Sequence, residues 1–144
     1  MAAAEGYFVD HQPADDCSGS SYFRQASEVY LTLDNGHALF YPGLRDPAAT
    51  PAAAKQLRAA LGCTDAIARG RRAMGTAKLA TLEVLHGDRD EGVALAHRAL
   101  DLGDGVRSVR LTDDLRRLRG ATTRHVGAPV QALQQRLDSV LASA

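Results

Sequence analysis

Apolar side chains recur every three or four residues through most of the chain after Thr50, the spacing that places them on one face of an α-helix. Turn and cap residues separate these periodic segments. Thr50 as N-cap, with Pro51 in the first turn, opens the first segment, and Gly62 closes it. We expect helices over 50–62, from 64 or 65 to 86, from 88 or 90 to 103, over about 106–119, and from 129 onward.

The segment that ends at His86 carries apolar residues on two faces. One face consists of Ile67, Gly70, Met74, Ala77, Thr81 and Val84, and the opposite face of Arg69, Arg72, Thr76 and Glu83. Leu79 and Leu82 fall outside the apolar stripe. Because a helix with two apolar faces usually contacts two neighbours, this helix should be central.

The connections between the predicted helices are short and contain glycine. Gly87 separates one pair of helices, and Gly103 to Gly105 separate the next. Short connections imply that successive helices are antiparallel neighbours. The pattern therefore predicts an all-α fold of antiparallel helical hairpins.

Residues 28–41 have two interpretations. Apolar residues alternate at Val29, Leu31 and Leu33 before an Asn35-Gly36 turn, which indicates a small β-hairpin near 28–41. A helical face also exists there, made up of Phe23, Ala26, Tyr30 and Leu33. We expect a helix that ends at Asn-Gly, because the rest of the chain is helical and two isolated strands are only marginally stable. The hairpin is the alternative.

Proline marks the segments that should lie outside helices. Pro42 and Pro47 predict an irregular stretch near 42–50, because proline inside a helix removes a backbone hydrogen bond. Residues 1–20 contain proline, glycine, serine and aspartate, which favour turns. With 144 residues the chain suits one domain. We expect a flexible segment over 1–20 and a single helical domain over 21–144.

Composition places the chain among globular proteins, with 45% apolar and 24% charged residues. Its 17 basic residues balance 17 acidic ones, so no net field draws it to nucleic acid or to anionic lipid. No apolar run approaches the roughly 18 residues of a membrane span, and the N-terminus lacks the pattern of a secretory signal. We expect a cytoplasmic protein without membrane contact, in which Cys17 and Cys63 are reduced.

Small residues surround the predicted turn at Gly87. Ala80, Gly92 and Ala99 fall where the two helices on either side of this turn would cross closely. This pattern resembles a tetratricopeptide repeat, a helix-turn-helix unit of about 34 residues whose helices meet through small side chains. The resemblance covers residues 65–104 and implies a helical-repeat surface that binds a partner.

A longer segment, from Ala66 to Leu137, is similar to the C-terminal region of actinobacterial helix-turn-helix transcription regulators. The residues that carry this likeness are Arg107, Ser108, Arg110, Leu115, Leu118, His125 and Pro129. In that family a tetratricopeptide-like domain follows a DNA-binding domain and serves ligand sensing or self-association. The resemblance implies a sensor module or a homodimer. The DNA-binding domain is absent from these residues, so nucleic-acid binding is not expected without a separate domain.

The sequence contains no recognisable catalytic or cofactor motif. None of the five histidines is paired at the spacing that puts two metal ligands on one helical face, so we expect no metal site. Phosphate-binding loops and nucleophile elbows are lacking, so we assign no catalytic residue and no cofactor. The acidic groups at 88–91 and 113–114 are interpreted as helix caps.

Five residues are candidates for ligand binding, namely Tyr22, Tyr30, His37, Arg71 and Lys78. Arg71 and Lys78 are seven positions apart and share a helix face, where they could clamp the carboxylate of a peptide or a small ligand. A solvated face with an ion pair to Glu83 is the alternative interpretation. We expect a non-enzymatic binding or regulatory module that recognises a protein, a peptide or a small effector. A small enzyme of a bacterial biosynthetic pathway that reuses the helical scaffold is the alternative function.

Overall fold

The computed structural model describes the backbone of residues 22–63 and 67–144, and the side chains of residues 27–63 and 67–144. Every regular element in these residues is helical, so the all-α prediction is confirmed and the alternative hairpin near 28–41 is wrong. The elements are α3 (Tyr22–Arg45), α4 (Thr50–Leu61), α5 (Arg69–His86), α6 (Arg89–Gly103), α7 (Val109–Ala121), the 3-10 helix η2 (Thr122–Arg124) and α8 (Ala128–Ala142). The segment 1–20, predicted to be flexible, lies outside the described residues.

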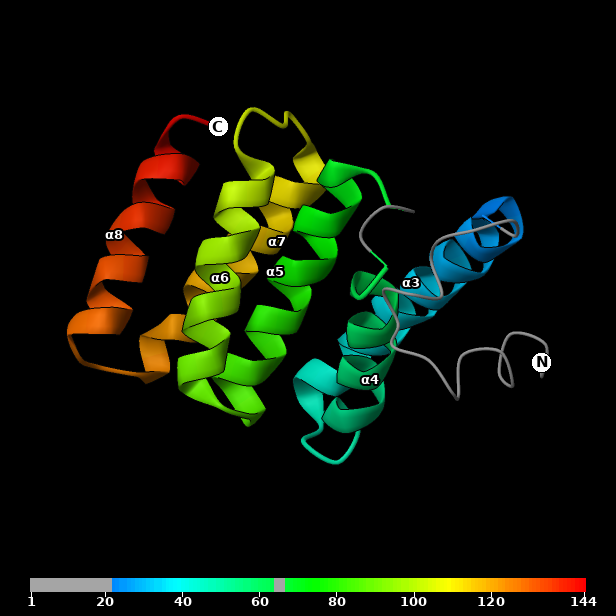
Figure 1. Ribbon diagram of the computed structural model, residues 1–144. Coiled ribbons are helices and arrows are strands. Elements are labelled where there is room, and N and C mark those ends of the chain that lie inside the picture. The colour runs from blue at the N-terminus through cyan, green and yellow to red at the C-terminus, as the bar shows by residue number, and fades with distance from the viewer. Residues whose placement is uncertain (1–21, 64–66) are drawn as a thin grey trace.

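Successive helices run in opposite directions (Figure 1). Helix α5 contacts α3, α4, α6 and α7, whereas α8 packs against α6 and α7. Only Gly87 and Asp88 separate α5 from α6, which forces these two helices into an antiparallel hairpin. The predictions of a central α5 and of antiparallel neighbours are therefore confirmed.

Helix α3 is longer than the sequence predicts. It passes through Asn35-Gly36 and reaches Arg45, with Pro42 in its last turn. A Cβ atom on Gly36 would lie 2.7 Å from Leu57 Cδ2, so this glycine allows α4 to pack closely instead of ending the helix. The irregular stretch expected over 42–50 is reduced to residues 46–49, because Pro42 stands near the helix end and removes only one backbone hydrogen bond.

The start of α4 also differs from its prediction. Ala49, and not Thr50, is the N-cap of this helix, and its side chain makes no capping hydrogen bond. The Thr50 hydroxyl instead donates to the Gly43 carbonyl oxygen at 2.9 Å. The group predicted to satisfy the backbone of α4 itself therefore ties the beginning of α4 to the end of α3.

Helices α5 and α6 meet at the predicted turn. Helix α5 begins at Arg69 instead of 64 or 65; residues 64–66 lie outside the described residues. It ends at His86 as expected. Asp88 caps α6, since its carboxylate accepts hydrogen bonds from the backbone N–H groups of Asp90 and Glu91. The boundary between the two helices is thus the part of the prediction that local chemistry determined best.

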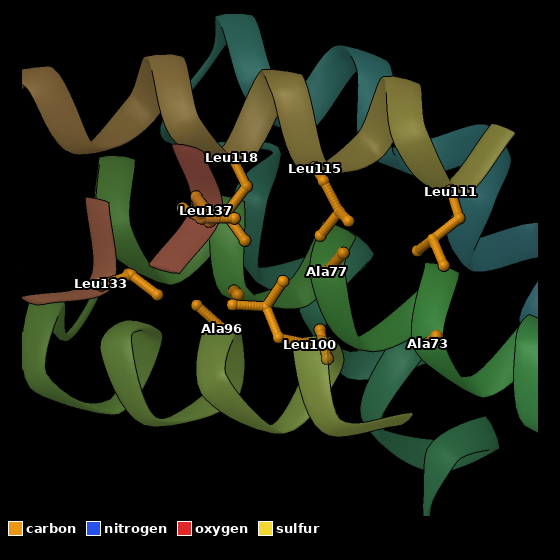
Figure 2. Close-up of a cluster of buried hydrophobic side chains, with 11 residues drawn as sticks. Ala73, Ala77, Ala96, Leu100, Leu111, Leu115, Leu118, Leu133 and Leu137 are labelled. Carbon is orange, nitrogen blue, oxygen red and sulfur yellow. The ribbon is translucent and has the colours of Figure 1, made fainter. Parts of the chain in front are cut away.

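One core lies between α5, α6, α7 and α8 (Figure 2). The first two helices contribute mainly alanines, and the last two contribute large leucines. The alanines are Ala73, Ala77, Ala80, Ala96 and Ala99, and the leucines are Leu111, Leu115, Leu118, Leu133 and Leu137. Because alanine side chains are short, α5 and α6 approach each other closely and leave room for leucines from the other side.

A second core joins α3 and α4 to the opposite side of α5. Leu79 and Leu82 of α5, which the sequence placed outside its main apolar stripe, are buried here. They pack with a group from the two earlier helices that includes Val29, Leu33, Phe40, Ala53, Leu57 and Ala60. The two apolar faces of α5 therefore serve two separate cores.

The state of Cys63 and the apolar character of the helices bear on two sequence-based predictions. Cys63 is buried just after α4 and is disulfide-bonded, so the prediction of a reduced thiol at this position is wrong. Cys17 lies outside the described residues. Among the helices of the described ranges, none has the length and apolar character needed to cross a membrane.

Gly92 provides a test of the close α5–α6 contact. A Cβ atom at this position would lie 2.7 Å from Val84 Cγ2 and 2.9 Å from the Val84 backbone nitrogen. Because the backbone cannot move aside cheaply, Gly92→Ala should lower the free energy of unfolding by about 1–3 kcal/mol, measured by urea denaturation.

Gly120→Ala is the matched control, because Gly120 is also helical and a Cβ atom added there would meet no neighbouring atom of the described residues within 4 Å. This substitution should be neutral or stabilise the protein by about 0.5–1 kcal/mol, since alanine restricts the unfolded chain. Equal stability of Gly92→Ala and the wild type would contradict the close crossing.

Candidate functional site

Four of the five candidate residues gather where α3 faces α5. Tyr30 and His37 belong to α3, and Arg71 and Lys78 belong to α5. The Arg71 guanidinium lies 5.0 Å from the centre of the Tyr30 ring, within the range of a cation–π contact. The side chain of Tyr22, the fifth candidate, lies outside the described residues.

Arg71 is held by α3 in two ways. Besides its contact with the Tyr30 ring, its guanidinium lies 2.6 Å from an Asp34 carboxylate oxygen. The Tyr30 hydroxyl in turn accepts a hydrogen bond of 2.9 Å from the Ala68 backbone N–H, at the start of α5. The predicted ion pair to Glu83 is not formed by Arg71 or Lys78, because Glu83 pairs with Arg58 at 2.6 Å. Arg71 therefore points along α3 and stays partly accessible.

Lys78 lies inside the protein, where it pairs with Asp114 of α7. Its Nζ donates to Asp114 Oδ2 at 2.7 Å, and the two side chains are 8% and 4% exposed. The ammonium group also lies 5.6 Å from the centre of the Phe40 ring. The expectation that Asp114 caps a helix is wrong, since Ser108 is the N-cap of α7. Lys78 acts as a link between α5 and α7 and cannot reach a ligand on the surface.

The position of Asp114 in the sequence already indicated a buried carboxylate. Leu111, Leu115 and Leu118 form the buried stripe of α7, and Asp114 lies three positions after the first of them. A carboxylate on an apolar stripe is normally paired when it is buried. Burial raises the pKa of Asp114 above its ordinary value, while the hydrogen bond and charge of Lys78 and the charge of Arg117 act in the opposite direction.

Arg117 extends this group of residues to the surface. Its guanidinium lies 5.7 Å from the centre of the Phe40 ring and 5.4 Å from that of Tyr41, and 3.4 Å from Asp114 Oδ1. Sequence analysis missed this residue, because its aromatic partners are on α3, far away in the chain. We use the name cationic–aromatic face for the surface formed by Leu31, Asp34, Tyr41, Arg71 and Arg117.

His37 lies beneath this face and is neutral at pH 7. Burial, followed by the positive charges of Lys78 and Arg71, lowers its pKa from 6.5 to about 4, against a smaller effect of Asp34. Its Nδ1 atom is buried and has no hydrogen-bond partner among the described residues. Neutral His37 therefore adds no further positive charge beside Lys78 and Arg71.

Two hollows of the described residues lie away from the candidate residues. A hollow of about 1010 Å³ lies at the α6–α7 connection and the end of α8, and another of about 330 Å³ lies between α4, α5 and α6. Neither contains Tyr30, His37, Arg71 or Lys78. Within residues 27–63 and 67–144, no group of three His, Cys, Asp or Glu side chains could hold a metal ion. The accessible part of the site is the surface on which the partly exposed Arg71 and Arg117 side chains lie.

The Lys78–Asp114 pair can be tested by removing one partner. Lys78→Met should lower the free energy of unfolding at pH 7 by about 3 kcal/mol, the low end for a broken buried pair, because Arg117 remains 3.4 Å from the buried carboxylate. Without Lys78 the pKa of Asp114 rises further, so the carboxyl becomes neutral as the pH falls and the deficit should shrink toward pH 4.5. Melting temperatures of both proteins at the two pH values measure this.

The double variant Lys78→Met/Asp114→Leu is the control, because it replaces the whole pair by apolar side chains. It should recover most of the lost stability, since a buried ion pair is rarely more stabilising than apolar residues of similar volume. A Lys78→Met protein as stable as the wild type at pH 7 would contradict a buried pair.

His37 predicts a stability change in mild acid. The unfolded chain takes up a proton near pH 6.5, whereas the folded protein does so only near pH 4. The contribution of neutral His37 is therefore complete above pH 6.5 and is lost as the pH falls toward 4. His37→Gln should lose less stability over this interval than the wild type. An NMR titration midpoint of the His37 ring near 6.5 would refute the assignment.

Comparison with known proteins adds no relative. No family model matches the chain, and no curated protein and no solved structure matches it. The likeness to tetratricopeptide-like regulator domains therefore stays a prediction that rests on the residues quoted for it. The geometry by itself establishes an all-α protein of helical hairpins with a cationic–aromatic face.

Proposed function

We propose that this chain is a non-enzymatic binding module that recognises a protein, a peptide or a small effector through its cationic–aromatic face. The observation that carries this proposal is the placement of Arg71 and Arg117 over tyrosine and phenylalanine rings of α3. Arginine and tyrosine are among the residues that most often dominate the energy of protein interfaces. The preferred ligand is a peptide segment that carries carboxylates.

The exposure of the face supports this function. Leu31, Asp34 and Tyr41 follow one another at helical spacing along α3, and Leu31 and Tyr41 are 62% and 45% exposed. Apolar groups of this size beside two arginines provide both contact area and charge for an acidic peptide. Asp34, which occupies Arg71 in the free protein, is itself largely exposed and can be displaced by a ligand carboxylate.

The resemblance to regulator domains fits the same function, because those domains sense ligands or self-associate. A sensor derived from such a regulator, and self-association as a homodimer, belong to this proposal on the strength of that resemblance alone. The cytoplasmic location also stays a prediction. The disulfide at Cys63 counts against it, because disulfides are rare in reducing compartments.

A selection of displayed random peptides on the immobilised chain tests the proposal. Recovered peptides should be enriched in Asp and Glu next to an apolar or aromatic residue. In fluorescence polarisation, Arg71→Gln and Arg117→Gln should each weaken binding of a recovered peptide by about tenfold, the effect of one charged hydrogen bond. Their melting curves should show that the fold is kept.

Arg89→Gln is the matched control, because Arg89 is a similarly exposed arginine on α6, away from the face. It should bind the peptide as the wild type does. Peptides without acidic enrichment, or equal losses in all three variants, would argue against the face. Turnover of a metabolite by the chain would favour the alternative of a small enzyme.

A further inference from the structure

The hollow between α4, α5 and α6 has a composition unlike the rest of the surface. One arginine from each of the three helices lines it: Arg58 of α4, Arg72 of α5 and Arg98 of α6. None of the residues that line it in the described part of the chain is acidic. The guanidinium groups bring several N–H donors to a hollow of about 330 Å³, and the charge of Arg98, which no carboxylate of the described residues balances, favours an anion there.

Helical spacing explains why these residues converge. Arg72, Thr76 and Leu79 lie at intervals of four and three on one side of α5. Leu95, Arg98 and Leu102 are spaced in the same way along α6. The stripe of α5 that the sequence assigns to a polar face is thus the floor of a groove, and α4 and α6 are its walls.

Thr76 gives a second, independent observation. It is one of four buried threonines, and the hydroxyls of the other three (Thr50, Thr81 and Thr122) each donate to a backbone carbonyl oxygen. The Thr76 hydroxyl makes no hydrogen bond to any of the described residues, although Thr76 as a whole is only 4% exposed. The Thr76 oxygen is not one of the fully buried side-chain atoms without a partner, so the hydroxyl opens onto the hollow and offers a donor there.

The arginines differ in how they are held. Arg58 also pairs with Glu83 and Glu91, at 2.6 and 2.7 Å, which fixes its position at the rim. Arg98 is exposed and makes no ion pair within the described residues. A ligand would therefore meet one anchored guanidinium, one guanidinium free to turn toward it, and the hydroxyl on the floor.

We propose that this hollow binds the phosphate group of a small molecule. Phosphate presents several acceptor oxygens and up to two charges, which suits arginines on three sides and a hydroxyl below. Leu61, Leu79, Leu95 and Leu102 line the remaining wall, and they favour a phosphate monoester with a compact apolar body over the free ion. The site shares no residue with the cationic–aromatic face, so it goes beyond the proposed function and can fail or succeed independently.

Isothermal titration calorimetry in phosphate-free buffer tests this site with four probes: phenyl phosphate, inorganic phosphate, benzoate and phenol. Phenyl phosphate should bind with one-to-one stoichiometry, and phenol should not bind. Tighter binding of phenyl phosphate than of inorganic phosphate assigns a monoester, and equal binding assigns the free ion. Absence of binding by both phosphates, or binding of benzoate as tight as that of phenyl phosphate, would overturn the proposal.

Two variants locate the binding. Arg98→Gln should weaken phenyl phosphate binding by about tenfold or more, the loss expected for one charged hydrogen bond. Arg89→Gln removes an equal charge from the same helix outside the hollow and should change the dissociation constant less than about twofold. Equal losses in the two variants would show that only net charge matters and would overturn the assignment.

Thr76→Val separates a binding role from a structural one. The substitution keeps the shape of the side chain and removes a hydroxyl that has no partner among the described residues, so the melting temperature should stay the same or rise. Phenyl phosphate binding should nevertheless fall by about tenfold. Unchanged binding in a folded Thr76→Val protein would remove Thr76 from the site.

Discussion

The close approach of neighbouring helices to α5 is the constraint on which the rest of the structure depends. Small residues line α5 where other helices contact it, including Ala73, Ala77 and Ala80. On another side, a Cβ atom on Gly75 would lie only 3.1 Å from Leu33 Cδ1. Four helices can therefore surround α5, and α8 takes its place through contacts with two of these, α6 and α7. A larger side chain at such a contact would move a whole helix, since a packed interior has no spare volume.

Both candidate binding surfaces follow from this central position. Successive residues of an α-helix point about 100° apart, so neighbours in the sequence face different helices. Arg71 points toward α3 and contributes to the cationic–aromatic face, whereas Arg72 lines the hollow between α4 and α6. Lys78 and Leu79 also face different neighbours: Lys78 pairs with Asp114 of α7, and Leu79 lines the hollow. Helix α5 thus contributes side chains to two surfaces, because other helices contact it on several sides.

Charge determines how α7 packs on α5. Lys78 and Asp114 are both buried, and each would be costly to leave unpaired. A shift of α7 by one turn along α5 would separate them by several ångströms, so the pair favours a single register. The positive charge of Lys78 also helps to keep His37 neutral. The ring of Phe40 lies near the Lys78 ammonium group. The electrostatics of the surface above are therefore coupled to the packing beneath it.

The sequence by itself determined the helices from α4 to α8, the cap at Asp88 and the tight contact at Gly92, because these features depend on residues close together in the chain. It also named Tyr30, His37 and Arg71 as candidates, and the structure places these residues where α3 faces α5. Only the tertiary structure decided that α3 continues through Gly36, since contact with Leu57 outweighs the weak local tendency of Asn-Gly to end a helix. The partner of Lys78 is 36 residues away and that of Arg71 is 37 residues away. Local patterns carry no information on such pairs, because the distance between them is set by how the helices pack.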